Sequence, residues 1–233
     1  MSKLEAAKLF SVEGLVAVIT GASSGLGEVM AHALDVNGVA KVFILGRRES
    51  KLKEVASKAK NGSLIPVVCD VTSKESLQAA ASTIANQTPF INVLIANSGY
   101  LGEVTSMAPR PAGKTVDELQ KELWDKTTVG QSGLLQSQFI STTSFGGLCR
   151  AEAPSYVYNA SKAALNHLTK TLSTEYARHG IRANAIAPGM FVTEMTEAHT
   201  PEGDLSAVGS MPWQAIPATR AGTEEVHLGS ASI

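Results

Sequence analysis

Short runs of apolar residues recur along the chain, and a polar stretch separates each run from the next. Six of these runs are continuously apolar rather than alternating, which is typical of strands covered on both faces of a parallel sheet. The pattern therefore predicts buried strands in six places. They are Leu15–Thr20, Val42–Leu45, Leu64–Val68, Ile91–Ala96, Phe139–Thr142 and Ala183–Ala187.

Two of the intervening stretches carry apolar residues at the three- and four-residue spacing of an amphipathic helix. The first predicted helix, residues 25–37, places four apolar side chains on one face: Leu26, Met30, Ala33 and Leu34. The second, residues 156–178, aligns Leu165, Leu168, Leu172 and Tyr176.

Two further helices are predicted from their starting residues. Residues 73–86 follow Thr72 and residues 116–127 follow Thr115, and each threonine has a glutamate three positions later. This is the spacing of a capping box, in which the two side chains satisfy free N–H groups at a helix start.

The alternation of strands and helices predicts a parallel sheet with right-handed crossovers and helices on both faces. A length of 233 residues suits one such domain, and we find no internal repeat or linker. We therefore predict an α/β fold with a doubly wound parallel sheet, a Rossmann fold, formed as a single domain by residues 1–233.

Composition and charge exclude several classes of protein. Twenty basic and 21 acidic residues give a formal charge of −1, so bulk electrostatics recruit neither nucleic acid nor a membrane surface. Two cysteines are too few for a disulfide framework or zinc cluster, and the five histidines lack metal-ligand spacing. The chain starts with charged residues, and the aliphatic run 15–19 is too short to span a bilayer. We expect a cytoplasmic protein without a metal.

A glycine-rich turn joins the first predicted strand to the first predicted helix. It reads Thr20-Gly21-Ala22-Ser23-Ser24-Gly25-Leu26-Gly27. Glycines at these places permit a tight turn, a close approach of the backbone to a pyrophosphate, and packing of helix on strand. The N-terminus of the helix offers free N–H groups to an anion. The turn therefore predicts dinucleotide binding by Gly21, Ser23, Ser24, Gly25, Leu26 and Gly27.

The residues after the second strand indicate which dinucleotide is bound. In NAD-binding proteins an acidic residue, about twenty positions beyond the glycines, binds the adenosine ribose. Here the chain reads Leu45-Gly46-Arg47-Arg48, and Arg47 can pair with a 2′-phosphate. This favours NADP (NADPH) over NAD. The alternative interpretation is that the two arginines open a solvated helix.

With these motifs the chain resembles the classical short-chain dehydrogenase/reductase family, and its carbonyl and 3-oxoacyl-[acyl-carrier-protein] reductase-like members in particular. The three-residue gap between Gly21 and Gly25 is that family's spacing, and further motifs follow in the family's order. The resemblance implies that Asp70 and Val71 hold the adenine. It also implies cofactor contacts from Asn97, Tyr158, Lys162, Pro188, Gly189, Phe191 and Thr193.

The resemblance also implies a catalytic set of Ser144, Tyr158 and Lys162. Tyr158 and Lys162 are four residues apart, so both lie on one face of the predicted helix. A free tyrosine has a pKa of about 10, and a neighbouring ammonium favours the phenolate. Lys162 would also bind the nicotinamide ribose, and Ser144 would hydrogen-bond the substrate oxygen. The alternative is a pair of ordinary surface residues on a helix.

The implied reaction is hydride transfer between nicotinamide and a carbonyl or alcohol substrate, such as a 3-oxoacyl thioester or another small ketone. Two segments of the family are nevertheless expected to be missing. Between Gly99 and Ser144 there is room for one helix, whereas relatives place two there. Either Thr127 stands where the second helix carries an asparagine of the proton relay, or the segment holding that asparagine is absent.

The second missing segment lies at the end of the sequence. After Glu225 relatives continue with a helix and a seventh strand, and that helix forms much of their subunit interface. We expect this chain to lack them, which leaves homo-oligomerisation open. The alternative function is therefore a dinucleotide-binding protein without turnover, inactivated by truncation.

Overall fold

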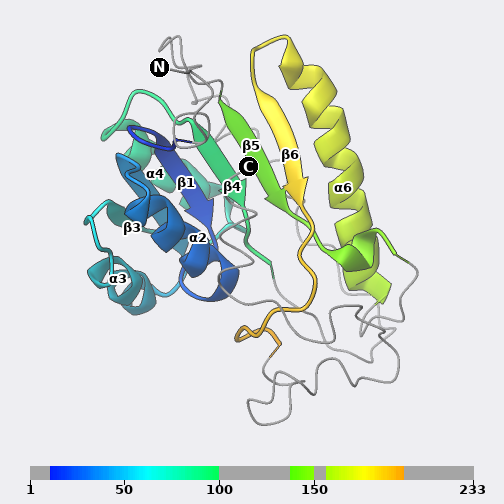
Figure 1. Cartoon of the computed structure of the whole chain (residues 1–233), viewed down its shortest axis with the longest axis horizontal. Helices are drawn as coiled ribbons and strands as arrows, with labels where there is room; N and C mark the ends of the chain where they lie inside the picture. Colours follow the sequence, from blue (N-terminus) through cyan, green and yellow to red (C-terminus); the bar gives the residue numbers. More distant parts are fainter. Residues whose placement is uncertain (1–10, 100–136, 150–155, 197–233) are drawn as a thin grey trace, which may run out of the picture.

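The computed structural model describes residues 11–99, 137–149 and 156–196. These residues form a six-stranded parallel sheet in the order β3-β2-β1-β4-β5-β6 (Figure 1). This confirms the predicted doubly wound sheet, and every strand lies within two residues of its predicted bounds. The strands are β1 (Val16–Thr20), β2 (Lys41–Gly46), β3 (Leu64–Val68), β4 (Val93–Ala96), β5 (Gln138–Thr142) and β6 (Arg182–Ile186). The predicted helix at 116–127 falls outside the described residues, and so do the two places where family segments are expected to be absent.

Within the ranges that the structure describes, four α-helices and a short 3-10 helix connect or follow the strands. They are α2 (Gly25–Val36), α3 (Glu49–Ser57), α4 (Lys74–Ala85), η1 (Phe145–Gly147) and α6 (Tyr156–Ala177). The helix α3 was not predicted, because it buries only Leu52 and Val55 and its remaining residues are mostly polar or charged. In the part of the chain that the structure describes, no helix has both the length and the apolar character to cross a membrane.

The predicted start of α4 needs a correction. Ser73 rather than Thr72 is the N-cap, and its hydroxyl accepts a hydrogen bond from Ser76 N at 3.2 Å. Glu75 accepts a hydrogen bond from the Ser73 hydroxyl, and Thr72 donates to Asp70 Oδ1 instead. The capping-box spacing therefore located the helix but identified the wrong cap.

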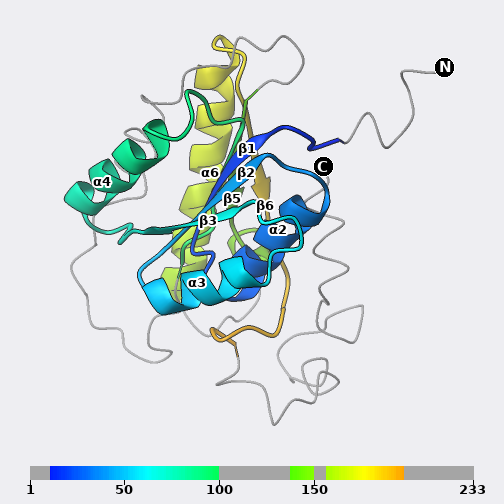
Figure 2. The same cartoon turned by 90° about the vertical axis from the view of Figure 1, so that its left-hand side faces the viewer.

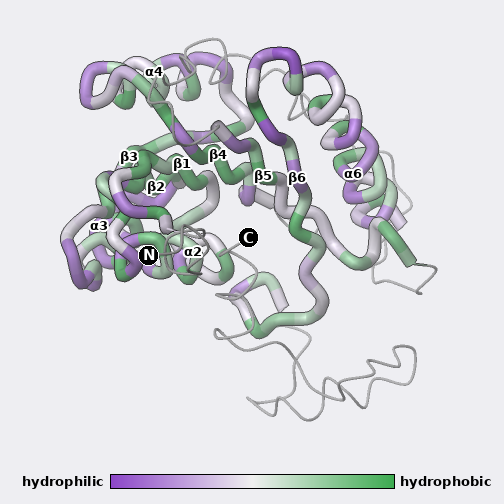
Figure 3. The backbone as a smooth tube through the Cα atoms, turned by 45° about the horizontal axis from the view of Figure 1, so that its top comes forward, coloured by the Kyte–Doolittle hydropathy of each residue, from purple (hydrophilic) through white to green (hydrophobic). Residues whose placement is uncertain are grey.

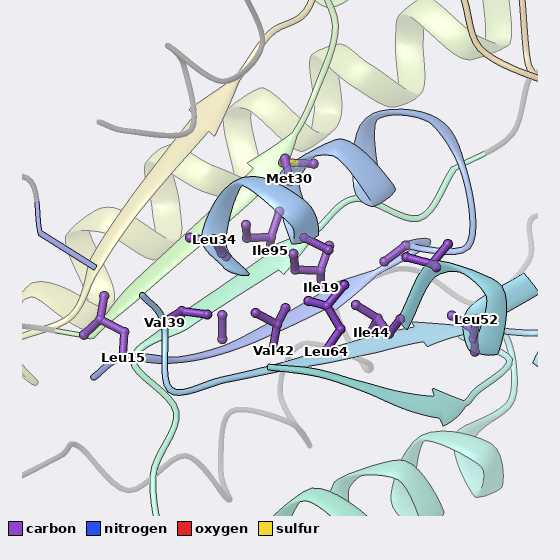
Figure 4. Close-up of a cluster of buried hydrophobic side chains, with 14 of the residues drawn as sticks. Leu15, Ile19, Met30, Leu34, Val39, Val42, Ile44, Leu52, Leu64 and Ile95 are labelled. Carbon is purple, nitrogen blue, oxygen red and sulfur yellow. The ribbon is translucent and has the colours of Figure 1, made fainter. Parts of the chain in front are cut away.

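Two hydrophobic clusters lie on the two faces of the sheet. Figure 2 shows the helices over these faces, with α2 and α3 on the side away from α4. Alternate residues of each strand point to opposite faces, so Ile19 packs under α2 and α3 while Val18 packs under α4. Figure 4 shows the first cluster, in which Met30 and Leu34 of α2 lie over the central strands. The hydrophobic colour in Figure 3 follows these central strands, whereas α3 is largely hydrophilic.

The parallel sheet brings all six carboxyl ends to one edge. Consecutive strands run outward from β1 to β3 on one side and from β4 to β6 on the other. The crevice between the two halves of such a sheet, at the carboxyl ends of β1 and β4, is where open α/β folds bind ligands. The segments after the strands therefore meet at this edge.

Asp35 joins α2 to the segment before β3. Its side chain is fully buried and accepts hydrogen bonds from Asn61 N (3.0 Å), Ser63 N (3.0 Å) and Ser63 Oγ (2.7 Å). Burial alone would raise the pKa of Asp35, but these hydrogen bonds outweigh burial and hold the pKa below its ordinary value. The ionised carboxylate therefore stabilises the folded chain.

We predict that Asp35→Asn lowers the free energy of unfolding by about 1–3 kcal/mol at pH 7, because the amide cannot accept all three hydrogen bonds. The stabilisation by Asp35 is present above its unfolded pKa of about 3.9 and is lost as pH falls through the lower folded pKa. Urea titrations of both proteins from pH 7 downward should show the difference shrinking below about pH 4. A difference that stays constant with pH would contradict this role.

Candidate functional site

The glycine-rich turn between β1 and α2 has the geometry that its sequence predicts. Gly21 and Gly25 have φ angles of 68° and 58°, in the left-handed region that favours glycine. The turn is fixed to the neighbouring strand, because Ala22 N donates to Leu45 O at 3.1 Å. A Cβ on Gly21 would lie 2.9 Å from Ser98 Cα, so the turn touches the segment after β4.

The start of α2 lies directly against this turn. A Cβ on Gly27 would lie 2.9 Å from Ala22 Cα and 2.7 Å from Asn97 Nδ2, so only glycine fits there. Ser24 is the N-cap, but its side chain makes no capping hydrogen bond. The first N–H groups of α2 therefore keep their capacity to bind an anion.

Thr20, which the sequence analysis did not assign, joins the ends of β1 and β4. Its hydroxyl oxygen accepts from Asn97 N at 3.1 Å and from Ser98 N at 3.0 Å. The Asn97 side chain donates to Thr20 O (3.2 Å) and to Gly21 O (3.3 Å). Asn97 thus holds the turn in place. The signal in the sequence was a single hydroxyl residue that ends an otherwise aliphatic strand.

After β2 the two arginines differ in position. Arg47 is exposed and lies close enough to Asp70 to lower the pKa of that carboxyl, although the hydrogen bonds from Thr72 lower it more. Arg48 reaches the glycine-rich turn, where Nη2 donates to Ser23 Oγ (3.3 Å) and Ser24 Oγ (3.1 Å). Nothing in the sequence distinguishes which arginine turns toward Ser23 and Ser24.

Asp70 and Val71 follow β3 at the same edge of the sheet. Asp70 Oδ1 accepts from Thr72 N (2.9 Å) and Thr72 Oγ1 (2.8 Å), and Asp70 N donates to Ser76 Oγ. Val71 is partly buried against the cluster under α4. The segment is therefore held rigidly beside the end of β2.

Ser144 follows β5 and is the N-cap of η1. Its side chain is buried, and Oγ accepts a hydrogen bond from Gly146 N at 3.2 Å. A hydroxyl also has one proton to donate, so Ser144 can hydrogen-bond a substrate oxygen while Gly146 fixes its position.

The helix α6 brings Tyr158 and Lys162 together. Lys162 Nζ lies 5.5 Å from the centroid of the Tyr158 ring and donates to Thr142 O at 2.8 Å. Burial lowers the pKa of Lys162. A Cβ on Gly99 would lie 3.8 Å from this ammonium, so Lys162 reaches both the segment after β4 and the end of β5.

Two glycines that the sequence analysis did not single out allow α6 to approach η1. A Cβ on Gly147 would lie 2.7 Å from the carbonyl carbon of Lys162 and 2.8 Å from Ala163 N. A Cβ on Gly146 would likewise overlap the side chain of Asn159. In addition, Asn166 Nδ2 donates a hydrogen bond to Gly147 O at 3.3 Å. This contact seats the first half of α6 beside Ser144.

The segment after β6 contacts the glycine-rich turn. Thr193, among the predicted cofactor contacts, lies against Gly25, because a Cβ there would be 3.2 Å from the Thr193 methyl group. Phe191 O accepts from Thr196 Oγ1 at 2.7 Å, which closes the loop, and Pro188 O accepts from Phe145 N at 3.1 Å. Gly189 is exposed between them.

The predicted residues therefore form two neighbouring groups at the carboxyl edge. One group surrounds the glycine-rich turn, and the other contains Ser144, Tyr158 and Lys162. The segment Ser98–Gly99 connects them, since Gly21 touches Ser98 and Lys162 lies beside Gly99. An uncapped helix N-terminus beside a cationic side chain suits an extended anionic ligand such as a dinucleotide.

Comparisons with known proteins identify the family of the chain. The family model described as "Enoyl-(Acyl carrier protein) reductase" matches residues 21–227. Two solved structures are similar: the RhlG/NADP active-site complex of Pseudomonas aeruginosa and the 3-ketoacyl-(acyl-carrier-protein) reductase of Brucella melitensis complexed with NADH. The first is 26% identical with a TM-score of 0.84, covering 96% of this chain and 90% of that one. The second is 25% identical with a TM-score of 0.68, covering 79% of each.

A curated relative, the short-chain dehydrogenase/reductase PhomF of Diaporthe leptostromiformis, is 38% identical over 224 positions, which cover 83% of this chain and 75% of the relative. Since 83% of 233 residues is about 193, the alignment passes over about 31 positions that have no counterpart in this chain. The identity, the extent of the match and the family model together show that the chain belongs to the short-chain dehydrogenase/reductase family of oxidoreductases.

Proposed function

We propose that the protein transfers hydride between NADP and a carbonyl or alcohol substrate, with Ser144, Tyr158 and Lys162 as its catalytic residues. The observation that carries this proposal is the position of Lys162. Its partly buried ammonium lies 5.5 Å from the centroid of the Tyr158 ring and is hydrogen-bonded to Thr142 O, two residues before Ser144. A cation, a phenol and a hydroxyl near one edge of the sheet support the proposal.

In the direction of reduction, a reduced nicotinamide held at this site would supply the hydride for the carbonyl carbon. Tyr158 donates its phenolic proton to the carbonyl oxygen, and Ser144 donates a hydrogen bond to the same oxygen. The Lys162 ammonium stabilises the phenolate that remains on Tyr158. Burial makes this charge more effective than it would be in water, because the surrounding dielectric is lower.

The glycine-rich turn would hold the pyrophosphate of the cofactor. Its N–H groups at the start of α2 are not capped by Ser24, and Gly21 and Gly25 leave the backbone open to close approach. We propose that Asp70 and Val71 border the adenine and that Thr193 and Asn97 border the nicotinamide half. The Lys162 ammonium would also bind the nicotinamide ribose.

The charge after β2 supports NADP over NAD. One similar structure is a complex with NADP and another a complex with NADH, so family membership leaves the choice open. In this chain Gly46, Arg47 and Arg48 occupy the positions where a ribose-binding acid would stand. Glu49 comes next, but its carboxylate is paired with Lys53 at 2.7 Å on the exposed face of α3.

The substrate proposal is a small ketone or a 3-oxoacyl thioester. It is supported by the similarity to the 3-ketoacyl-(acyl-carrier-protein) reductase of Brucella melitensis. The alternative is a dinucleotide-binding protein without turnover. It would be favoured if the roughly 31 unmatched positions of the PhomF alignment include the segment that carries the asparagine of the proton relay.

Cofactor choice gives the first prediction for this site. NADPH should bind more tightly than NADH, and Arg47→Asp should reverse or flatten the preference, because a hydrogen-bonded charge pair is worth about 1.5–3 kcal/mol, or roughly 10- to 150-fold in affinity. Fluorescence titration of both reduced cofactors measures this. Equal affinities in the unmodified protein would rule out the assignment.

Tyr158→Phe should reduce turnover by about 10²- to 10⁴-fold, because general acid catalysis contributes that much. NADPH affinity should stay nearly unchanged, since the lost hydroxyl acts on the substrate. Lys162→Ala is the informative comparison, because it should weaken both turnover and cofactor binding. Full activity of Tyr158→Phe on a substrate of the unmodified protein would show that the proton comes from another group.

Gly147→Ala should displace α6 from η1, because the added methyl group would overlap the backbone of Lys162 and Ala163. We expect a loss of about 1–3 kcal/mol in stability and a fall in kcat for the folded fraction. Gly180→Ala is the matched control: Gly180 has a φ of 70° but open space around it, so stability falls without a change at the site. If both variants keep the kcat of the parent, the close contact has no catalytic role.

A further inference from the structure

The carboxylate of Glu194 forms an ion pair with the guanidinium of Arg48 beside the glycine-rich turn. Glu194 Oε2 accepts from Arg48 Nη2 at 2.9 Å, and Oε1 accepts from Arg48 Nη1 at 3.4 Å. The same carboxylate accepts from Ser24 Oγ at 3.1 Å. The two charged residues are 146 positions apart, so this contact joins the segment after β2 to the segment after β6.

The guanidinium of Arg48 lies where the 2′-substituent of the adenosine ribose is expected. In dinucleotide-binding folds that ribose sits at the carboxyl end of the second strand, beside the glycine-rich turn. Here the last residue of β2 touches the turn, because a Cβ on Gly46 would lie 3.4 Å from Ser23 Cβ. Arg48 donates to the hydroxyl of the same serine.

A carboxylate and a phosphate bind a guanidinium in the same way, through two oxygens on two N–H groups. Glu194 therefore uses the donors that a 2′-phosphate would need. The ion pair is about half exposed, with side-chain exposures of 47% and 51%. Such pairs contribute little to stability, so an incoming dianion can displace the carboxylate.

We propose that Arg48 is a second arginine of the 2′-phosphate site and that Glu194 is an internal competitor that occupies it until NADP binds. The proposal rests on the NADP preference stated above and adds a determinant of it. NADH carries no 2′-phosphate and leaves the ion pair intact. The 2′-phosphate of NADPH replaces Glu194 as the partner of Arg48. The contact between Arg48 and the segment after β6 is therefore broken by NADPH and kept with NADH.

Equilibrium binding tests the proposal without any catalytic readout. The probes are NADPH, NADH, adenosine 2′,5′-bisphosphate and adenosine 5′-monophosphate, titrated against the full chain. Glu194→Gln keeps the size of the side chain and removes its charge. Affinity for NADPH and the bisphosphate should rise about two- to five-fold, while affinity for NADH and the monophosphate should stay unchanged.

Two further variants identify the cause of any change. Glu54→Gln removes the same charge from an exposed face of α3, where Glu54 pairs with Lys51 and Lys58, and should leave the four affinities unchanged. Arg48→Gln should weaken NADPH, and in the double variant with Glu194→Gln the gain should disappear. A gain of the same size with Arg48→Gln present would show that Glu194 acts through general charge rather than through Arg48.

The outcomes separate this proposal from the one on which it rests. If the unmodified protein binds NADPH and NADH equally, the NADP preference itself is wrong. If it prefers NADPH and Glu194→Gln changes nothing, the preference stands and the competition is refuted. If Glu194→Gln weakens NADPH and NADH alike, Glu194 holds the loop over the cofactor, which also overturns the proposal.

Discussion

The candidate site depends on the close contact between the glycine-rich turn and the segment that follows β4. The contact is possible because Gly21 and Gly27 have no Cβ where Ser98 and Asn97 approach. The Thr20 hydroxyl then accepts hydrogen bonds from the backbone of both residues. A larger side chain at either glycine would separate the two halves of the sheet at the point where open α/β folds bind their ligands.

A second pair of glycines permits a similar close contact on the other side of the site. Gly146 and Gly147 let α6 lie against η1, so that Lys162 reaches the end of β5 and Tyr158 lies beside it. The two contacts share one consequence. Backbone of one segment is held within van der Waals distance of backbone of another, so the functional side chains need little freedom of their own. This preorganisation is what general acid catalysis and oxyanion stabilisation require.

The sequence predicted the strands and the long helices because their signals are local. Continuous apolar runs marked the strands, and the spacing of Leu165, Leu168 and Leu172 marked α6. The short helix α3 was missed because two buried residues give no clear period. The role of Ser73 as N-cap was missed because two hydroxyl residues stand side by side, and only the backbone decides between them.

For the candidate site, sequence motifs located the glycine-rich turn, Ser144, Tyr158 and Lys162. Contacts between distant residues were not predictable. Arg48 and Glu194 are ordinary exposed charges in the sequence, and Thr20 and Gly147 become informative only when β4 and α6 lie beside them. Such contacts depend on the folded arrangement of whole elements, which a single sequence with local periodicity does not specify.

The proposed activity, reduction of a carbonyl substrate by NADPH, can be measured directly. The most direct measurement follows NADPH oxidation by its absorbance, with the purified chain and a panel of ketones and 3-oxoacyl thioesters. The account predicts loss of NADPH that requires both protein and substrate, with one alcohol formed for each NADPH consumed. If the protein binds NADPH but no member of the panel causes its oxidation, the proposed activity is contradicted. That result would support a dinucleotide-binding protein without turnover.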